Sequence, residues 1–192
     1  MKTFSNESSL SPPVTAALAI WFGSVVVLGT SGTFVRAPGA LPAMYGLEKY
    51  LAEGSIESAL RQLIKLRASQ INGCAYCVDM HWKDARAAGE TEQRLYGLMA
   101  WREAPYYSER ERAALAWTEA LTLITDNHAP DELYEQTRRQ FSEQELVDLT
   151  LAVTTINAWN RIAIGFRSEP GKYQPASRRF EALVDEVGLD IR

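Results

Sequence analysis

The sequence predicts an all-α protein with a single helical domain. From residue 40 onward, hydrophobic residues recur at intervals of three and four, which is typical of amphipathic helices. No stretch alternates polar and apolar residues between hairpin turn signals, and no tandem repeat, low-complexity segment or Pro/Ser-rich linker divides the chain. A chain of 192 residues can bury a sizeable core within one domain.

The first 33 residues differ in character from the rest of the chain. No charged residue occurs between Glu7 and Arg36, and residues 16–28 ("AALAIWFGSVVVL") are dense in apolar side chains. This dense run is shorter than the roughly 20 apolar residues that a membrane-spanning helix needs. We therefore expect residues 1–33 to form a buried or subunit-interface helix, with no membrane span, ahead of a helical domain over residues 34–192.

Local signals place the next helices in order. Ser55 is expected to cap a helix over residues 55–70, which the Asn-Gly pair at 72–73 ends. A second helix is expected over residues 74–88, because Gly89 is a favourable residue directly after a helix.

Shorter segments follow the same logic. Thr91 is expected to start a short helix that ends before Pro105, and Pro130 suits the first turn of a later helix. A last helix is expected over residues 175–187, because Gly188 follows it.

Two capping boxes mark the remaining helix starts. In a capping box, a Ser and a Glu three residues later each accept the other's backbone N–H. The pairs are Ser108 with Glu111 and Ser142 with Glu145. The apolar stripe after the first pair consists of Ala114, Trp117, Leu121 and Ile124. The helix after the second pair is apolar on much of its circumference, so we expect it in the middle of the fold.

Composition excludes several classes of protein. The net charge is −4, and no block of Lys or Arg provides the basic patch that nucleic-acid binding needs. Two cysteines in 192 residues do not make a disulfide-stapled secreted scaffold. We therefore expect no nucleic-acid partner, and a reducing compartment such as the cytoplasm.

Both cysteines lie in one motif, "NGCAYCVDMHW", at residues 72–82. In a helix, Cys74, Cys77 and His81 would lie at i, i+3 and i+7, within a stripe about 60° wide. A thiol in the first turn lies close to free backbone N–H groups, which lower its pKa. His81, one turn beyond Cys77, can accept a thiol proton, and the cysteine spacing allows a disulfide. This layout is typical of a thiol peroxidase or disulfide reductase.

Two other interpretations compete with a redox site. Cys74, Cys77 and His81 could be three zinc ligands, but the chain has no further cysteine and only one other histidine, His128. We therefore expect no metal, and expect His128 to be exposed. Alternatively, the cysteines are small buried hydrophobic residues beside a core histidine.

Longer stretches resemble a known family. These are "FVRAPGALPAMYGLEKYL", "LRASQINGCAYCVDMHWKDARAAGETEQRLYGLMAWREAPYYSERERAALAWTEALT" and "FSEQELVDLTLAVTTINAWNRIAI". They look like the alkylhydroperoxidase AhpD-like group of the carboxymuconolactone decarboxylase family, over roughly residues 34–166. The resemblance implies an all-helical, AhpD-like domain that assembles as a trimer or hexamer. It also implies reduction of organic hydroperoxides without a bound cofactor, with an external dithiol as reductant.

The resemblance also implies a role for each residue of the motif. Cys77 is the peroxidatic thiol, Cys74 forms the disulfide with it, and His81 is the base of a proton relay. The family's relay usually begins with a glutamate twelve residues before the first cysteine, where this chain has Gln62. An amide can hold a water by hydrogen bonds but cannot take up a proton at neutral pH, so we expect Gln62 to share a water with His81. The family's best-known peroxidase has a histidine between its cysteines, where this chain has Tyr76.

These departures leave alternatives open. Other acids could serve the relay: Glu48, Glu57 or Asp79. The protein could also exchange disulfides, act as a non-catalytic redox-sensing oligomer, or be a lactone decarboxylase, although that chemistry has no use for a CxxC pair. Asn157 and Asn160 could be a structural clamp or contacts of the pocket.

Overall fold

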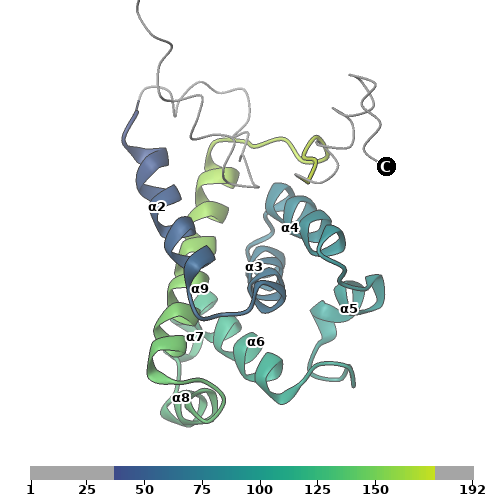
Figure 1. Cartoon of the computed structure of the whole chain (residues 1–192), viewed down its shortest axis with the longest axis vertical. Coiled ribbons are helices and arrows are strands. Elements are labelled where there is room, and N and C mark those ends of the chain that lie inside the picture. Colours follow the sequence, from purple (N-terminus) through teal and green to yellow (C-terminus); the bar gives the residue numbers. More distant parts are fainter. Residues whose placement is uncertain (1–36, 176–192) are drawn as a thin grey trace, which may run out of the picture.

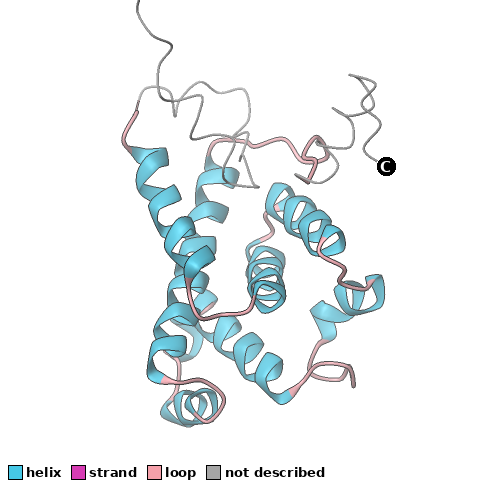
Figure 2. Cartoon of the chain, viewed as in Figure 1, coloured by secondary structure: helices cyan, strands magenta, loops and turns pink. Residues whose placement is uncertain are grey.

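The computed structural model describes residues 37–175, and every regular element among them is helical (Figure 2). The elements are α2 (Ala40–Glu53), α3 (Ser58–Asn72), α4 (Ala75–Ala87), α5 (Glu92–Gly97), the 3₁₀ turn η2 (Leu98–Ala100), α6 (Glu109–Thr122), α7 (Ile124–Asn127), α8 (Asp131–Arg138) and α9 (Glu143–Gly165). This confirms the all-α prediction. The extension over residues 1–33 and nearly all of the helix expected over 175–187 lie outside the described residues.

Helix α3 occupies the centre of the fold (Figure 1). Helices α2 and α9 lie on one side of it, α4 and α5 on the other, and α6 also packs against it. The fully buried residues of α3 face all of these neighbours; they are Leu63, Ile64, Leu66, Ala68 and Ser69. Helix α9, which was expected in the middle of the fold, packs against α2, α3, α4, α6 and α8, while Val147 on its outer face is 56% exposed.

Three of the predicted helix starts are confirmed. Ser108 and Glu111 exchange backbone N–H hydrogen bonds at the start of α6, and Ser142 and Glu145 do the same at the start of α9. The hydroxyl of Thr91 accepts the N–H of the third residue of α5. Each such cap contributes about 1 kcal/mol, so three helix starts are set by local sequence.

One expected cap was wrong. Helix α3 begins at Ser58, and Ser55 instead donates its backbone N–H and its hydroxyl to Oδ2 of Asp148, over 3.0 and 2.7 Å. The hydroxyl of Tyr50 donates to Oδ1 of the same carboxylate. Burial raises the pKa of Asp148, but these hydrogen bonds outweigh burial and lower the pKa overall. Ser55 therefore ties the α2–α3 turn to α9.

A second correction concerns the end of α6. This helix stops at Thr122, because Leu123 leaves the helical conformation (φ −103°, ψ 45°). Ile124 begins the separate turn α7 and is 43% exposed, so it does not belong to the buried stripe. Pro130 caps α8 rather than lying in its first turn.

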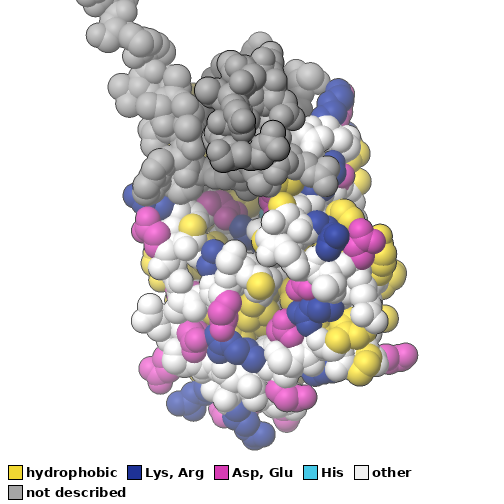
Figure 3. Space-filling view, turned by 45° about the vertical axis from the view of Figure 1, so that its right-hand side comes forward, with side chains coloured by type: hydrophobic (Ala, Val, Ile, Leu, Met, Phe, Trp, Pro, Cys, Tyr) yellow, Lys and Arg dark blue, Asp and Glu magenta, His cyan; other side chains and the backbone are white. Residues whose placement is uncertain are grey.

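Surface features agree with the composition. On the face shown in Figure 3, basic and acidic side chains are interspersed and form no large basic patch. Between residues 37 and 175, no helix combines the length and apolar character that crossing a bilayer requires.

Candidate redox site

The turn between α3 and α4 positions Cys74. Gly73 ends α3 in the left-handed region (φ 67°), where a side chain would be strained. The N–H of Cys74 then donates to the carbonyl of Ser69 over 3.0 Å. Cys74 is the N-cap residue of α4, and its Sγ accepts the N–H of Cys77 over 3.3 Å. The sulfur therefore lies at the positive end of a helix, as the sequence predicted.

Cys74 and Cys77 are joined in a disulfide whose Cα atoms are 5.3 Å apart. Their exposed fractions are only 1% and 2%. The two cysteines belong to one buried cluster with Tyr76, Met80, Ala163 and Tyr173. The redox pair is therefore enclosed by apolar and aromatic side chains.

His81 follows Cys77 by one helical turn and is held by Gln62. Its Nδ1 lies 3.1 Å from Oε1 of Gln62. A carbonyl oxygen only accepts, so this bond places the proton on Nδ1 and leaves a lone pair on Nε2. Nε2 is buried and has no hydrogen-bond partner in the part of the chain that the structure describes. The ring is therefore oriented with its basic nitrogen unengaged.

Electrostatics keep His81 neutral. Burial is the main cause, and the nearby positive charge of Lys65 adds to it; together they lower the pKa of His81 well below 6.5. Gln62 carries no charge that could oppose this shift. His81 is therefore an uncharged imidazole, able to accept a proton but of reduced basicity.

Lys65 is a component of this site that the sequence interpretation missed. Its ammonium is buried and pairs with one carboxylate oxygen of Glu48, while the indole N–H of Trp159 donates to the other oxygen over 2.9 Å. Lys65 lies three residues after Gln62 and therefore on the same side of α3. A charge flanked on both sides by apolar residues, in "LIKL" at residues 63–66, was the available signal.

The acids considered as relay groups all pair with cations. The pairs are Glu57 with Arg110, Asp79 with Lys83, and Glu48 with Lys65. Within the described residues, the hydrogen-bond partner of the imidazole is Gln62 rather than any of these acids. Of the three, only Glu48 lies beside a residue that influences His81.

The asparagines of α9 hold the end of α3. One amide nitrogen of Asn72 donates to Oδ1 of Asn157 and to Oδ1 of Asn160, over 2.9 and 2.8 Å. Asn160 is fully buried and donates to the hydroxyl of Ser69 over 3.0 Å. These contacts fix Ser69 and Asn72, near the end of α3, against α9, so both asparagines act as a structural clamp.

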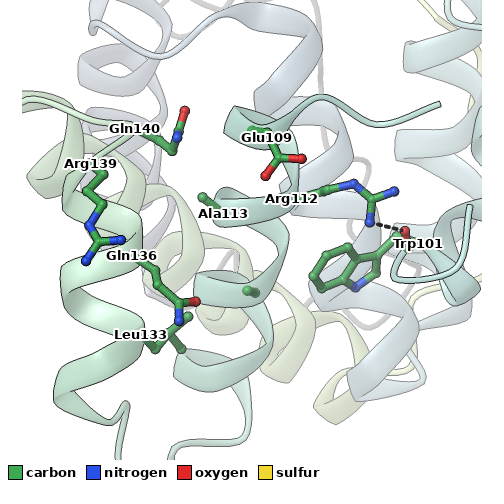
Figure 4. Close-up of a pocket in the computed structure, with 9 residues that line it drawn as sticks. Trp101, Glu109, Arg112, Ala113, Leu133, Gln136, Arg139 and Gln140 are labelled. Atoms are coloured by element: carbon green, nitrogen blue, oxygen red, sulfur yellow. Dashed lines mark hydrogen bonds between the residues drawn. The ribbon is translucent and has the colours of Figure 1, made fainter. Parts of the chain in front are cut away.

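A separate hollow of about 430 Å³ lies between α6 and α8 (Figure 4). Its lining includes Trp101, Arg112, Leu133 and Gln136. The Arg112 guanidinium is occupied by backbone carbonyls, among them that of Trp101 at 3.2 Å. This hollow contains neither cysteine nor histidine, so it is distinct from the redox site. Over residues 37–175, no group of three His, Cys, Asp or Glu side chains is placed to hold a metal ion.

Comparisons with known proteins place this site in a family. The family model "Carboxymuconolactone decarboxylase family" matches residues 38–120, which include Gln62 and the whole CxxC motif. The chain is 51% identical over 128 residues to the uncharacterized protein YdfG of Bacillus subtilis, covering 67% of this chain and 87% of YdfG. It is 30% identical over 99 residues to the uncharacterized protein YnjA of Escherichia coli, covering 51% of this chain and 53% of YnjA.

A solved structure from Agrobacterium tumefaciens is also similar. That protein has no established function, and a role as the antioxidant defence protein AhpD has been suggested for it. Sequence identity is 47% and the TM-score is 0.70, with 73% of this chain and 97% of the other covered. The chain described here therefore belongs to the carboxymuconolactone decarboxylase family and is an AhpD-like member of it.

Proposed function

We propose that this protein is a thiol peroxidase that reduces organic hydroperoxides through Cys77 and Cys74. The observation that carries the proposal is a buried cysteine pair at the start of α4 with a neutral imidazole one turn away. A small-molecule oxidant, a nucleophilic thiol and a proton acceptor are what such a reaction needs. The role suggested for the Agrobacterium protein supports it.

The reaction runs in two oxidative steps. His81 accepts the thiol proton of Cys77 at Nε2, and the thiolate attacks the terminal oxygen of the hydroperoxide. The O–O bond breaks, Cys77 becomes a sulfenic acid, and the alkoxide takes the proton from His81 to leave as an alcohol. The Cys74 thiol then attacks the Cys77 sulfur, which forms the disulfide and releases water.

An external dithiol completes the cycle. Its thiolate attacks one sulfur of the disulfide, and its second thiol resolves the mixed disulfide. The dithiol is thereby oxidised, and Cys74 and Cys77 return to thiols. The electrons that reduce the hydroperoxide therefore come from the external dithiol.

The proposal is tested by hydroperoxide consumption. Purified protein is mixed with cumene hydroperoxide and dithiothreitol, and the loss of peroxide is followed over time. We expect catalytic consumption by the wild-type protein and only the uncatalysed rate with the matched Cys74→Ser/Cys77→Ser variant. Equal rates for the two proteins would refute a peroxidase.

The Gln62 amide favours disulfide exchange as a second candidate. An amide cannot exchange protons with His81, which would slow the peroxide step but not the attack of a thiol on a disulfide. Reduction of a disulfide-bonded test peptide distinguishes the two. Exchange without peroxide turnover would favour this candidate.

A further inference from the structure

After α9 the chain turns back across α4. Residues 168–175, called the strap below, form neither helix nor strand, yet they are held in place. Figure 1 shows this yellow-green segment running from the end of α9 toward the helix that carries the redox pair. The strap therefore joins the last described helix to the candidate redox site.

Polar contacts attach the strap to α4. The Lys83 ammonium donates to the carbonyls of Gly171 and Tyr173, over 3.3 and 3.1 Å. Oδ2 of Asp79 accepts the backbone N–H of Gly171 over 3.1 Å. The hydroxyl of Tyr173 donates to Oδ1 of Asp84 over 2.6 Å. All three anchoring side chains belong to α4 and lie within two turns after Cys77.

Tyr173 places an aromatic ring among the residues around the disulfide. It is 7% exposed and belongs to the same buried cluster as Cys74, Cys77, Tyr76 and Met80. Its hydroxyl is directed to Asp84, so the ring is fixed at one end by a hydrogen bond and at the other by apolar contacts. The strap therefore closes part of the apolar enclosure of the redox pair.

The reaction proposed above requires that two reactants reach the cysteines, first a hydroperoxide and then a reducing dithiol. A reducing thiolate must bring its sulfur into bonding contact with a sulfur of the disulfide. Both sulfurs belong to residues that are at most 2% exposed, so a protein surface cannot reach them in the closed arrangement. Reduction by a large dithiol therefore requires that the enclosure open widely. Reduction by a small dithiol requires a smaller opening.

We propose that Tyr173 determines which thiols reduce the disulfide, because the strap must lift from α4 before a bulky dithiol can reach it. The strap is the segment of the enclosure that can move without breaking a helix, since it is held by polar contacts with three side chains and by its buried residues Tyr173 and Pro175. A small movement of the enclosure admits a small dithiol, whereas lifting of the strap is needed to admit a protein dithiol. This inference rests on the redox function proposed above.

The test measures reduction of the oxidised full-length protein by two reductants of different size. The probes are dithiothreitol and reduced thioredoxin, and free thiols are counted by alkylation and mass spectrometry at successive times. We expect Tyr173→Ala to accelerate reduction by thioredoxin at least about tenfold, since a buried ring and a hydrogen bond that favour the closed state are lost. Acceleration with dithiothreitol should be clearly smaller. Tyr173→Phe, which keeps the ring, should lie between wild type and Tyr173→Ala.

Two further variants make the outcome decisive. Tyr96→Ala removes a tyrosine that is 62% exposed and lies outside the cluster, so both rates should stay at the wild-type value. Lys83→Met loosens the strap without altering the cluster. It should accelerate reduction of the disulfide by thioredoxin, and it tests the proposal even if Tyr173→Ala does not fold. The proposal would be overturned if Lys83→Met and any folded Tyr173→Ala were reduced at wild-type rates. It would also be overturned if the variants accelerated reduction by both reductants equally. Peroxide consumption is measured separately, so a failed peroxidase and a failed gate give different results.

Discussion

Nδ1 of His81 lies 3.1 Å from the side-chain oxygen of Gln62, so an uncharged amide orients the imidazole beside the redox pair. The contact is direct, closer than the water-mediated arrangement that the sequence suggested. Orientation and tautomer are therefore provided, whereas a negative charge that would raise the basicity of His81 is not. Four predictions follow from this arrangement and its surroundings.

Replacing Gln62 by Glu should increase peroxide turnover. A carboxylate at this position accepts the same hydrogen bond, raises the pKa of His81 and can exchange protons with it. General acid–base assistance contributes about a hundredfold or more, so Gln62→Glu should raise the rate by up to about that factor. The pH profile of turnover should gain a limb from the new carboxylate. Gln62→Ala is the matched control and should lower the rate; an unchanged rate in both variants would remove Gln62 from the mechanism.

The two cysteines should differ in their response to peroxide. Cys77→Ser should abolish peroxide consumption, because the thiol one turn from His81 is lost. Cys74→Ser keeps that thiol but cannot form the disulfide, so one sulfenic acid per chain should be trapped by dimedone and counted by mass spectrometry. Equal trapping in the two variants would show that the roles are not divided in this way.

His81 should make the free energy of unfolding depend on pH. The pKa of His81 in the folded chain lies well below 6.5, so below pH 6.5 the unfolded chain binds a proton that the folded chain does not bind. As pH falls below 6.5 toward the folded pKa, stability should drop with a slope approaching about 1.4 kcal/mol per pH unit. Above pH 6.5 this contribution is constant. Urea unfolding at pH 7.5, 6.5 and 5.5 should show the loss in wild type and a smaller one in His81→Gln; parallel losses would contradict it.

Removing one charge of the Glu48–Lys65 pair should destabilise the fold strongly, whereas removing both charges should change stability little. Lys65→Met leaves a largely buried carboxylate without its cation, and should lower the free energy of unfolding by about 3 to 5 kcal/mol. Lys65→Met/Glu48→Gln removes both charges but keeps an acceptor for Trp159, so its stability should lie within about 1 kcal/mol of wild type. In the double variant the NMR titration of His81 should move to higher pH, with His128 as the reference signal. A double variant as unstable as the single one would contradict this account.

Local rules account for the parts of the fold that the sequence predicted. The Ser108 and Ser142 capping boxes act across three residues, and the spacing of Cys74, Cys77 and His81 acts within two helical turns. Such signals depend on backbone geometry that the segment itself creates, so no knowledge of the tertiary structure is needed.

The residues that escaped prediction depend on distant partners. Ser55 is of a residue type that commonly caps helices, but Asp148, 93 residues later, accepts hydrogen bonds from both its backbone N–H and its hydroxyl. Glu48 meets Trp159 across 111 residues, and its link to the site through Lys65 has no periodic signature. Asn160 carried a signal, since a buried amide requires partners, but only the structure shows that Ser69 and Asn72 are those partners.

Most of the polar contacts between the strap and α4 involve the main chain of the strap. Lys83 binds the carbonyls of Gly171 and Tyr173, and Asp79 binds the N–H of Gly171, so these contacts do not depend on side-chain identity. Substitutions at Glu169, Lys172 and Gln174, all exposed, should therefore be tolerated in related sequences and in libraries. Gly171, with φ at 93°, and the buried residues Tyr173 and Pro175 are the positions where this segment restricts changes of sequence. Engineering that changes reductant preference can therefore concentrate on these three positions and vary the exposed residues of the segment.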